Sequence, residues 1–310
     1  MSTTSTPTMT TARTIKQTVY ATEQSEGAGA RVRRSIGSSS LRNLSPFLLL
    51  DHFSSGAGSG FPDHPHRGQE TITYMLSGGF QHEDFAGNAG TIWAGDLQFM
   101  KAGRGIMHSE MPVVQTDGTL NAGLQLWVDL KEEEKLGEPT YRDLKAAEIP
   151  SVKSEDGKAL VKIIAGRSQG TESVRDLAGQ PVWLVDVTLQ PGGRVAQEVP
   201  AGWTAFAYVL SGSVSFGEGP AAKKVKQFEN AVFDTDGDHV VAALPADAIE
   251  EARFVFVAGE PLDQKVVQYG PFVLTTEQGV RQALRDYQMH TNGFERAEGW
   301  RSEIGKRMVH

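Results

Sequence analysis

The chain of 310 residues contains no cysteine. Disulfide bonds, thiolate nucleophiles and cysteine-based zinc or iron–sulfur sites are therefore excluded, and any metal ion must be bound by histidine, aspartate or glutamate. Long apolar runs are missing too: the longest, residues 240–246 (VVAALPA), is far below the roughly 18 residues of a membrane-spanning helix. We therefore expect a soluble protein without a transmembrane segment.

Positive charge is also in short supply. Thirty Lys and Arg residues face 38 Asp and Glu residues, for a net charge of -8, which is poorly suited to binding a polyanion. We expect no direct contact with nucleic acid. Near the N-terminus there is neither a signal-peptide core nor an Arg-rich transit pattern. We predict a disordered tail over residues 1–13 and a cytoplasmic protein, also nuclear if its source is eukaryotic.

Glycine, by contrast, is abundant, with 34 residues beside 14 prolines. This composition suits many short strands joined by tight turns. Short apolar runs bounded by Gly, Asn, Asp and Pro recur along the chain. The runs predicted to form strands are 46–50, 71–76, 90–93, 124–130, 160–164, 183–189, 206–210 and 254–257.

One apolar run is repeated. Residues 74–78 (YMLSG) recur as 208–212 (YVLSG) at an offset of 134 residues. Two copies of an all-β unit, joined by the charged stretch 131–143, account for the length of the chain. We predict two tandem β-barrels over 14–135 and 136–310. The second includes a short helix over 275–288, expected to pack outside a barrel.

Histidines are concentrated in the first half. Five of the eight lie between His52 and His108. His64 and His66 have the i, i+2 spacing that places both side chains on one face of a strand, and His108 and Glu110 repeat that spacing. His52 and His82, the other two of the five, are interpreted as structural or supporting residues.

A shared metal ion explains this clustering, because buried imidazoles and carboxylates are costly unless they are paired or bound. Three nitrogens and one carboxylate suit Fe(II), Mn, Co, Ni, Cu or Zn rather than Mg or Ca. Four protein ligands on a six-coordinate ion leave two positions for O2 or a bidentate anionic ligand. The residues leave the carboxylate open: Glu70 shares the parity of His64 and His66, and is an alternative to Glu110 as ligand or a partner that orients a histidine.

Several segments resemble the pirin family of the cupin superfamily. They are 61–68 (FPDHPHRG), 82–85 (HEDF), 95–98 (GDLQ), 102–112 (AGRGIMHSEMP), 23–37 (EQSEGAGARVRRSIG) and 267–273 (VQYGPFV). The likeness covers nearly everything after the tail. It implies an all-β fold of two tandem cupin (jelly-roll) barrels, with one non-haem Fe(II) in the first barrel held by residues matching His64, His66, His108 and Glu110. The resemblance thus favours Glu110 over Glu70, which stands where the general cupin pattern has its carboxylate.

The repeat offset predicts that the second barrel has lost these ligands. Adding 134 places Glu198, Pro200, Ala242 and Leu244 where the first barrel has His64, His66, His108 and Glu110. His239, beside Asp236 and Asp238, is interpreted as a turn residue. We expect the second barrel to be a structural partner or a surface for another protein.

The resemblance implies two possible functions. One is a quercetin 2,3-dioxygenase-like enzyme that cleaves a flavonol with O2, with Glu110 as the catalytic base. Apolar residues that could line its pocket or merely fill the barrel are Phe53, Phe99, Met100, Met107 and Leu126. The alternative is a redox-sensing transcriptional co-regulator whose iron oxidation state controls binding to a transcription factor, with basic runs at 31–34 and 223–226 as surface candidates. A monomer is expected.

Overall fold

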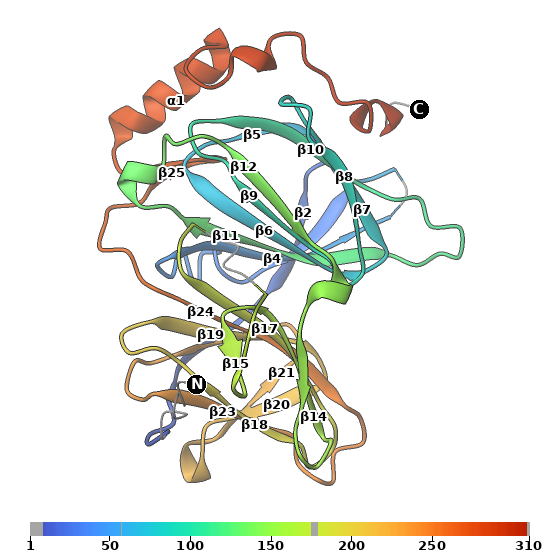
Figure 1. Ribbon diagram of the computed structural model, residues 1–310, viewed down its shortest axis with the longest axis vertical. Coiled ribbons are helices and arrows are strands. Elements are labelled where there is room, and N and C mark those ends of the chain that lie inside the picture. Colours follow the sequence, from blue (N-terminus) through green and yellow to red (C-terminus); the bar gives the residue numbers. More distant parts are fainter. Residues whose placement is uncertain (1–8, 57, 175–178, 309–310) are drawn as a thin grey trace, which may run out of the picture. The chain divides into compact units, whose positions relative to one another are not determined.

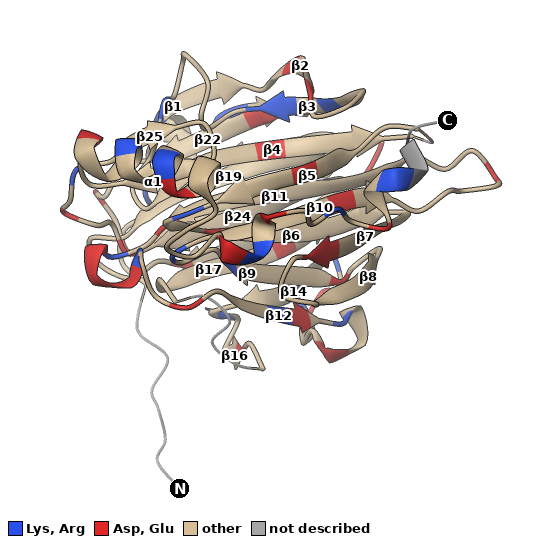
Figure 2. Cartoon of the chain, turned by 90° about the horizontal axis from the view of Figure 1, so that it is seen from above, with Lys and Arg blue, Asp and Glu red and all other residues tan. Residues whose placement is uncertain are grey.

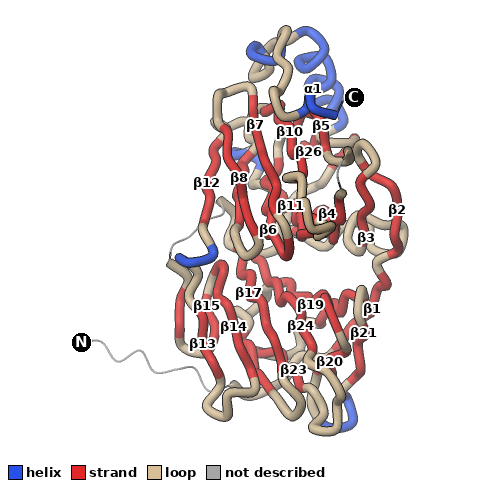
Figure 3. Tube along the Cα trace, turned by 90° about the vertical axis from the view of Figure 1, so that its right-hand side faces the viewer, coloured by secondary structure: helices blue, strands red, loops and turns tan. Residues whose placement is uncertain are grey.

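The structure is a computed structural model that describes residues 9–56, 58–174 and 179–308. The chain divides into two compact units built from antiparallel strands (Figures 1 and 3). We call Thr22–Ala146, Leu177–Gln180 and Leu262–His310 the first-barrel unit. We call Met1–Ala21, Ala147–Asp176 and Pro181–Pro261 the second-barrel unit.

The first-barrel unit contains a seven-stranded and a four-stranded sheet. In order across the larger sheet, the strands are β12 (Thr140–Leu144), β9 (Leu97–Lys101), β6 (Gln69–Ser77), β11 (Asn121–Asp129), β4 (Phe47–Ser55), β3 (Ala30–Arg34) and β2 (Thr22–Glu26). Across the smaller sheet they are β5 (Phe61–His66), β10 (Ile106–Pro112), β7 (Gly79–Asp84) and β8 (Ala89–Trp93). The remaining elements are the hairpin β25 (Val267–Tyr269) and β26 (Phe272–Leu274), the helix α1 (Glu277–Met289), and the 3-10 turns η1 (Glu132–Glu134), η4 (Glu295–Ala297) and η5 (Gly305–Met308).

The second-barrel unit repeats this plan. Its larger sheet runs β1 (Ile15–Tyr20), β22 (Glu229–Phe233), β19 (Thr204–Ser211), β24 (Ala252–Gly259), β17 (Val182–Leu189), β14 (Ala159–Ala165) and β13 (Ser151–Lys153). Its smaller sheet runs β18 (Arg194–Glu198), β23 (His239–Ala243), β20 (Ser213–Phe216) and β21 (Lys223–Lys226). A small hairpin of β15 (Arg167–Ser168) and β16 (Thr171–Glu172) and the 3-10 turns η2 (Ala146–Glu148) and η3 (Gly219–Ala221) complete the elements. The predicted all-β fold of two tandem barrels with a short C-terminal helix is confirmed.

The strands lie where the apolar runs predict them. Each of the eight predicted runs overlaps an observed strand, such as 71–76 in β6 and 254–257 in β24. Only Pro46 and Leu130 of these runs fall outside their strands, β4 and β11. In β19, residues 205–210 are all buried, because strands packed on both faces read as continuous apolar runs. Inward-facing residues of the second-barrel unit form one apolar cluster that includes Val161, Phe216 and Phe254.

The boundaries predicted at residues 135 and 136 differ from the observed division. β12 pairs with β9 inside the first-barrel sheet, so the charged stretch 131–143 is not a linker. β1 pairs with β22 in the second-barrel sheet, whereas α1 belongs to the first-barrel unit. The two ends of the chain are thus exchanged between the units. The internal repeat could not reveal this, because neither end lies in the repeated segment.

Helix α1 confirms the predicted helix within two residues at its start and one at its end. Thr276 Oγ1 caps it by accepting a hydrogen bond from Gly279 N at 3.0 Å, and the backbone then turns left-handed at His290. The helix carries charges of both signs (Figure 2), while Val280 and Ala283 on its buried side join the apolar cluster of the β26 strand.

The chain's N-terminal segment is partly ordered. The predicted disordered tail over 1–13 falls outside the described residues as far as residue 8, but it is wrong for Thr10 and Arg13. Thr10 Oγ1 donates to Asp238 at 2.7 Å, and the buried Arg13 guanidinium donates to three backbone carbonyl groups. Across the described part of the chain, no helix has both the length and the apolar character needed to span a membrane.

Candidate metal centre

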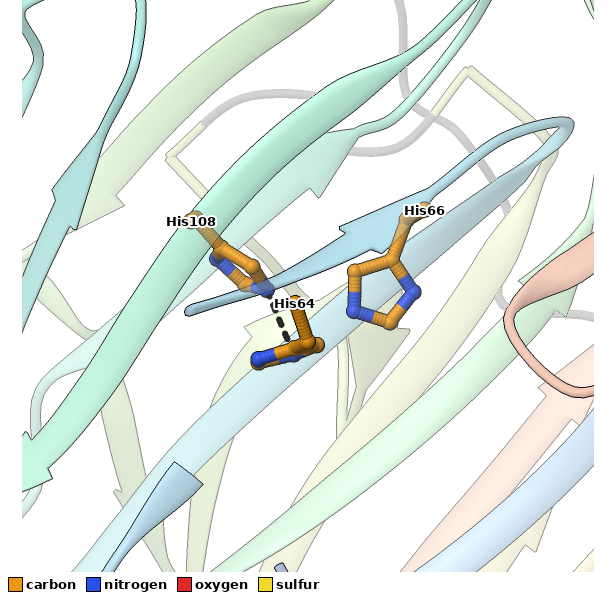
Figure 4. Close-up of side chains that lie close together, drawn as sticks. All are labelled: His64, His66 and His108. Carbon is orange, nitrogen blue, oxygen red and sulfur yellow. Dashed lines mark hydrogen bonds between the residues drawn. The ribbon is translucent and has the colours of Figure 1, made fainter. Parts of the chain in front are cut away.

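Two adjacent strands bring three imidazoles together. β5 carries His64 and His66 on one face, and its antiparallel neighbour β10 places His108 directly opposite His64. The ring centroids are 4.4 Å apart for His64 and His108, 4.8 Å for His64 and His66, and 5.0 Å for His66 and His108. Figure 4 shows the three rings gathered on the same side of these strands. The i, i+2 prediction is confirmed for the histidines.

The strand β5 ends in a turn that only glycine accommodates. Gly68 has φ +86°, and a Cβ there would lie 2.0 Å from the carbonyl oxygen of Val273. Arg67, the residue before Gly68, is buried and forms an ion pair with Asp286 of α1 at 2.7 Å. The C-terminal helix and hairpin therefore hold the end of the strand that carries His64 and His66.

Hydrogen bonds occupy four of the six imidazole nitrogens of the cluster and leave two without a protein partner among the described residues. His64 Nδ1 donates to the carbonyl oxygen of Pro62 at 2.8 Å, which places the lone pair of His64 on Nε2. That lone pair accepts a hydrogen bond from His108 Nε2 at 3.0 Å (Figure 4). His66 Nε2 and His108 Nδ1 are buried and have no hydrogen-bond partner among the described residues. Buried polar atoms without partners are rare and point to a missing ligand or water.

The protonation of the cluster favours metal binding. Burial lowers the pKa of His66 and of His108 well below 6.5, and the charge of nearby histidines lowers both further. Both rings are therefore neutral at pH 7, the form in which imidazole binds metals. The ligand atoms of the three histidines lie within 4.8 Å of one another. On this donor set and these unpartnered nitrogens, the residues fit a divalent transition metal.

Glu110 lies two residues beyond His108 on β10, past an irregularity in the pairing with β5. Its Oε2 accepts a hydrogen bond from Gln125 Nε2 at 3.0 Å, and Gln125 Oε1 in turn accepts from Trp127 Nε1 at 3.0 Å. Thr73 Oγ1 lies 3.4 Å from Glu110 Oε1. Glu110 is not in the group of possible metal ligands found among the described residues, which contains the three histidines. It lines the same cavity as His64 and His66, and on that ground it stays a candidate ligand and base.

Glu70, the other carboxylate considered, has different partners. Its Oε1 accepts from Gly179 N at 2.7 Å and its Oε2 from Gln180 N at 3.4 Å. Glu70 is buried, and burial raises the pKa of its carboxyl group. Like Glu110, it does not belong to the group of possible metal ligands found among the described residues, and unlike Glu110 it does not line the cavity. The structure therefore places the Glu70 carboxylate on the backbone amides of Gly179 and Gln180 rather than in the histidine cluster.

The remaining predicted histidines also lie outside the cluster. His52 lies on β4, within the larger sheet. His82 lies opposite Glu110 on β7, and its ring stacks on Tyr141 with the centroids 6.1 Å apart. His82 Nε2 lies 3.5 Å from Asp143 Oδ2. These positions agree with the interpretation of both residues as structural or supporting.

A cavity of about 520 Å³ opens beside the cluster, within the range of roughly 300–1,000 Å³ typical of small-molecule sites. Of the five apolar residues singled out from the sequence, only Phe53 lines it. Met100 packs with Ala102, and Met107 packs in the cluster beneath α1. The larger apolar lining residues outside that set of five are Val32, Leu49, Phe61 and Trp127.

Two cavity residues that the sequence predictions omit share a spacing that could have revealed them. Gln125 and Trp127 have the same i, i+2 spacing as the histidine pairs, in a strand that the sequence predicts. Both side chains therefore lie on one face of β11, and both line the cavity. Nothing in the sequence links them to Glu110, because that link depends on how β11 and β10 meet in space.

The second barrel has a different arrangement at the corresponding strands. Glu198 on β18 lies opposite His239 on β23, not opposite Ala242 as the constant offset predicts. His239 is therefore a buried strand residue and not a turn residue. Glu198 forms an ion pair with Arg167 at 2.6 Å, and His239 Nδ1 lies 2.7 Å from Asp238 Oδ1.

Comparison with known proteins now connects the site to a family. The family "Pirin" matches residues 29–128, which include the histidine cluster, and "Pirin C-terminal cupin domain" matches 184–293. The chain is 46% identical to human pirin over 96% of this chain and 100% of that protein. It is 45% identical to pirin-like protein 2 of Arabidopsis thaliana over 94% and 89% of the two chains. A crystal structure of quercetin 2,3-dioxygenase from Acinetobacter baumannii superposes with a TM-score of 0.81 and 28% identity, over 90% of this chain and 98% of that one.

Proposed function

The chain belongs to the pirin family, and on that premise we propose that it is a metal-dependent dioxygenase that cleaves flavonols with O2. Fe(II) is the proposed metal. The single observation that carries the proposal is the cluster of three neutral imidazoles beside a cavity of small-molecule size. The similarity to a quercetin 2,3-dioxygenase over nearly the whole chain supports the same reaction class.

The metal would be held by His64, His66, His108 and Glu110. When bound, it would supply a Lewis acid with open positions for O2 and for the deprotonated hydroxyl of the substrate. The chain's own part begins with orientation: the bond from His64 Nδ1 to Pro62 presents His64 Nε2 as a ligand. Gln125 orients the carboxylate of Glu110 in a similar way, by donating to its Oε2. Trp127 Nε1 donates to Gln125 Oε1 and thereby keeps the Gln125 amide nitrogen directed at Glu110.

Glu110 is the proposed general base. A carboxylate that lines the cavity is within reach of a hydroxyl proton on a bound substrate. Proton transfer requires a free oxygen lone pair. To act as the base, Glu110 would have to leave or loosen from the metal. The contact from Thr73 to Oε1 is long at 3.4 Å, so Oε1 is the oxygen more available to receive the proton, while Gln125 holds Oε2.

The cavity walls support a neutral, hydroxylated aromatic substrate. Phe53, Phe61 and Trp127 provide aromatic surface for a planar ring system. Glu26 and Asp51 line the same cavity and are both paired with the Arg34 guanidinium, so this wall carries a net negative charge. Carboxylates accept hydrogen bonds from phenolic hydroxyl groups and repel anionic substituents.

The test is turnover by the iron-loaded protein, followed as O2 consumption with quercetin. We expect turnover in the wild type and its loss in His66→Ala together with the metal. The matched control is His239→Ala, a buried histidine of the second barrel outside the cluster, which should retain both metal and turnover. Metal binding without turnover of quercetin or other flavonols would refute the enzymatic proposal.

The alternative regulatory function gains no specific support from the two basic runs. Arg31 and Arg33 of β3 pair with Glu23 of β2, so the basic strand lies beside neutralising charge (Figure 2). Residues 223–226 form β21 at the edge of the smaller sheet of the second barrel. Lysine on an edge strand is a common protection against pairing with another chain. Redox-dependent capture of a transcription factor by a protein without turnover would revive this alternative.

A further inference from the structure

Gln69 connects the histidine cluster to the C-terminal hairpin. It lies three residues after His66, at the start of β6, and is fully buried. Its Nε2 lies 3.0 Å from His66 Nδ1 and 3.0 Å from the carbonyl oxygen of Pro271. Pro271 stands in the turn between β25 and β26 and lines the cavity. One amide therefore contacts both a proposed metal ligand and a wall of the substrate cavity.

These two contacts determine where the His66 ring carries its proton. The carbonyl oxygen of Pro271 can only accept, so the amide atom of Gln69 that faces it must be the nitrogen. This nitrogen has a second hydrogen, which it donates to His66 Nδ1. A neutral imidazole that accepts at Nδ1 carries its proton on Nε2. In this arrangement, His66 Nε2 therefore lacks the lone pair that a metal requires.

Metal binding reverses the requirement. Ligation through Nε2 leaves the proton of His66 on Nδ1, which then needs an acceptor such as a carbonyl or carboxylate oxygen. Gln69 offers its Oε1, which has no hydrogen-bond partner among the described residues. Oε1 reaches Nδ1 only if the amide turns over. The bond from Gln69 to Pro271 is then lost, because an amide oxygen cannot donate.

We propose that Gln69 is a positioning residue that couples the metal centre to the β25–β26 hairpin. When His66 binds metal through Nε2, the Gln69 amide turns over, accepts from His66 Nδ1 and releases Pro271. The inference rests on the proposed function only in taking His66 as a metal ligand. Arg67 keeps the hairpin attached, since its N donates to Pro271 O and its O accepts from Val273 N. Metal loading therefore loosens the cavity wall without detaching it.

The first test uses Zn(II) and the full-length chain, because Zn(II) is diamagnetic and binds imidazole nitrogens. Nitrogen-15 NMR of the histidine rings should place the His66 proton on Nε2 in the metal-free protein and on Nδ1 after Zn(II) is added. Amide hydrogen exchange in the hairpin should then be about 5-fold faster, since one hydrogen bond of roughly 1 kcal/mol is lost.

Variants of Gln69 separate this coupling from a general effect of metal. Gln69→Glu supplies an acceptor for His66 Nδ1 without a donor. We therefore expect Zn(II) to bind about 10-fold more tightly, because a ligating histidine binds better when its other nitrogen donates to a carboxylate. Amide exchange in the hairpin should no longer respond to Zn(II). Gln69→Leu should also make amide exchange in the hairpin insensitive to Zn(II). This variant replaces Gln69→Glu in the test if Gln69→Glu does not fold. The matched control is Gln268→Leu. Gln268 bonds Gly270 in the same turn but not His66, so this variant should respond to Zn(II) as the wild type does.

The failures are distinguishable. If Zn(II) moves the His66 proton but the hairpin of the Gln69 variants responds as in the wild type, coupling through Gln69 is wrong and the ligand role of His66 stands. If Zn(II) leaves the His66 ring signals unchanged, His66 is not a ligand. In that case the proposed function fails with the inference.

Discussion

The two barrels share one strand order but differ at the same pair of strands. In the first barrel, β5 and β10 place His64 opposite His108. In the second, β18 and β23 place Glu198 opposite His239. Glu198 and His239 each have a charged partner. The histidine cluster of the first barrel instead contains buried ring nitrogens with no protein partner among the described residues.

This difference separates residues that stabilise a repeated fold from residues suited to binding a ligand. Groups that pair with one another stabilise the fold and need no ligand. Buried imidazoles without partners reduce stability, and proteins retain such groups mainly where a ligand compensates. Shared topology therefore does not predict shared chemistry, and the hydrogen-bond partners of each side chain do.

The largest expected effect tests how the two units use ion pairs. In the first-barrel unit, Arg67 and Asp286 are each 4% exposed, whereas Arg167 in the second barrel is 44% exposed. Arg67→Met should lower the free energy of unfolding by about 3–5 kcal/mol, because it leaves the buried Asp286 carboxylate without its cation. Arg167→Met should cost less than about 1 kcal/mol. Urea unfolding of both variants measures this, and equal losses would contradict the comparison.

A second prediction concerns the support of Glu110. Gln125→Leu removes the donor to Glu110 Oε2 and should weaken Zn(II) binding about 10- to 100-fold, the usual cost of losing a partner of a ligand. The matched control is Gln197→Leu in the second barrel, where Gln197 Nε2 bonds backbone oxygens of Arg167 and Glu198. Competition titration with a chelator compares them. Unchanged affinity in Gln125→Leu would show that Glu110 is not a supported ligand.

The smallest expected effect is a pH dependence specific to the first barrel. Burial lowers the pKa of His66 and His108 in the folded metal-free protein, so both stay neutral while the unfolded chain gains protons below pH 6.5. Stability should therefore fall with decreasing pH, by up to about 1.4 kcal/mol per pH unit for each histidine. His108→Gln should make this decline shallower in denaturation experiments from pH 7.5 to 5.5. An identical decline would contradict the assigned cause.

Much of the fold was accessible from the sequence. Strand positions follow from apolar runs that recur with turn residues between them, and the repeat predicts two barrels. The histidine pair on β5 is predictable because side chains two residues apart share a face of any strand. Tertiary pairing was not accessible. The exchange of β1 and α1 between the units involves partners more than 200 residues away in the chain.

The site could be predicted only as far as local spacing reaches. His64, His66, His108 and Glu110 stand in two short motifs. The position of Glu70 depends on Gly179 and Gln180, which no local pattern connects to it. The same is true of Gln69, whose role depends on the C-terminal hairpin. The offset of 134 residues predicts Ala242 as the counterpart of His108. This is wrong because the offset does not hold for β23, where His239 rather than Ala242 faces Glu198.

The most direct test of the central claim is the metal content of the protein purified without oxygen. The account predicts about one transition-metal ion per chain in the wild type and in the His239→Ala control, with iron as the proposed metal. It predicts none in the double variant His64→Ala, His108→Ala. A wild-type chain without a transition metal, or a double variant that retains one, would contradict it.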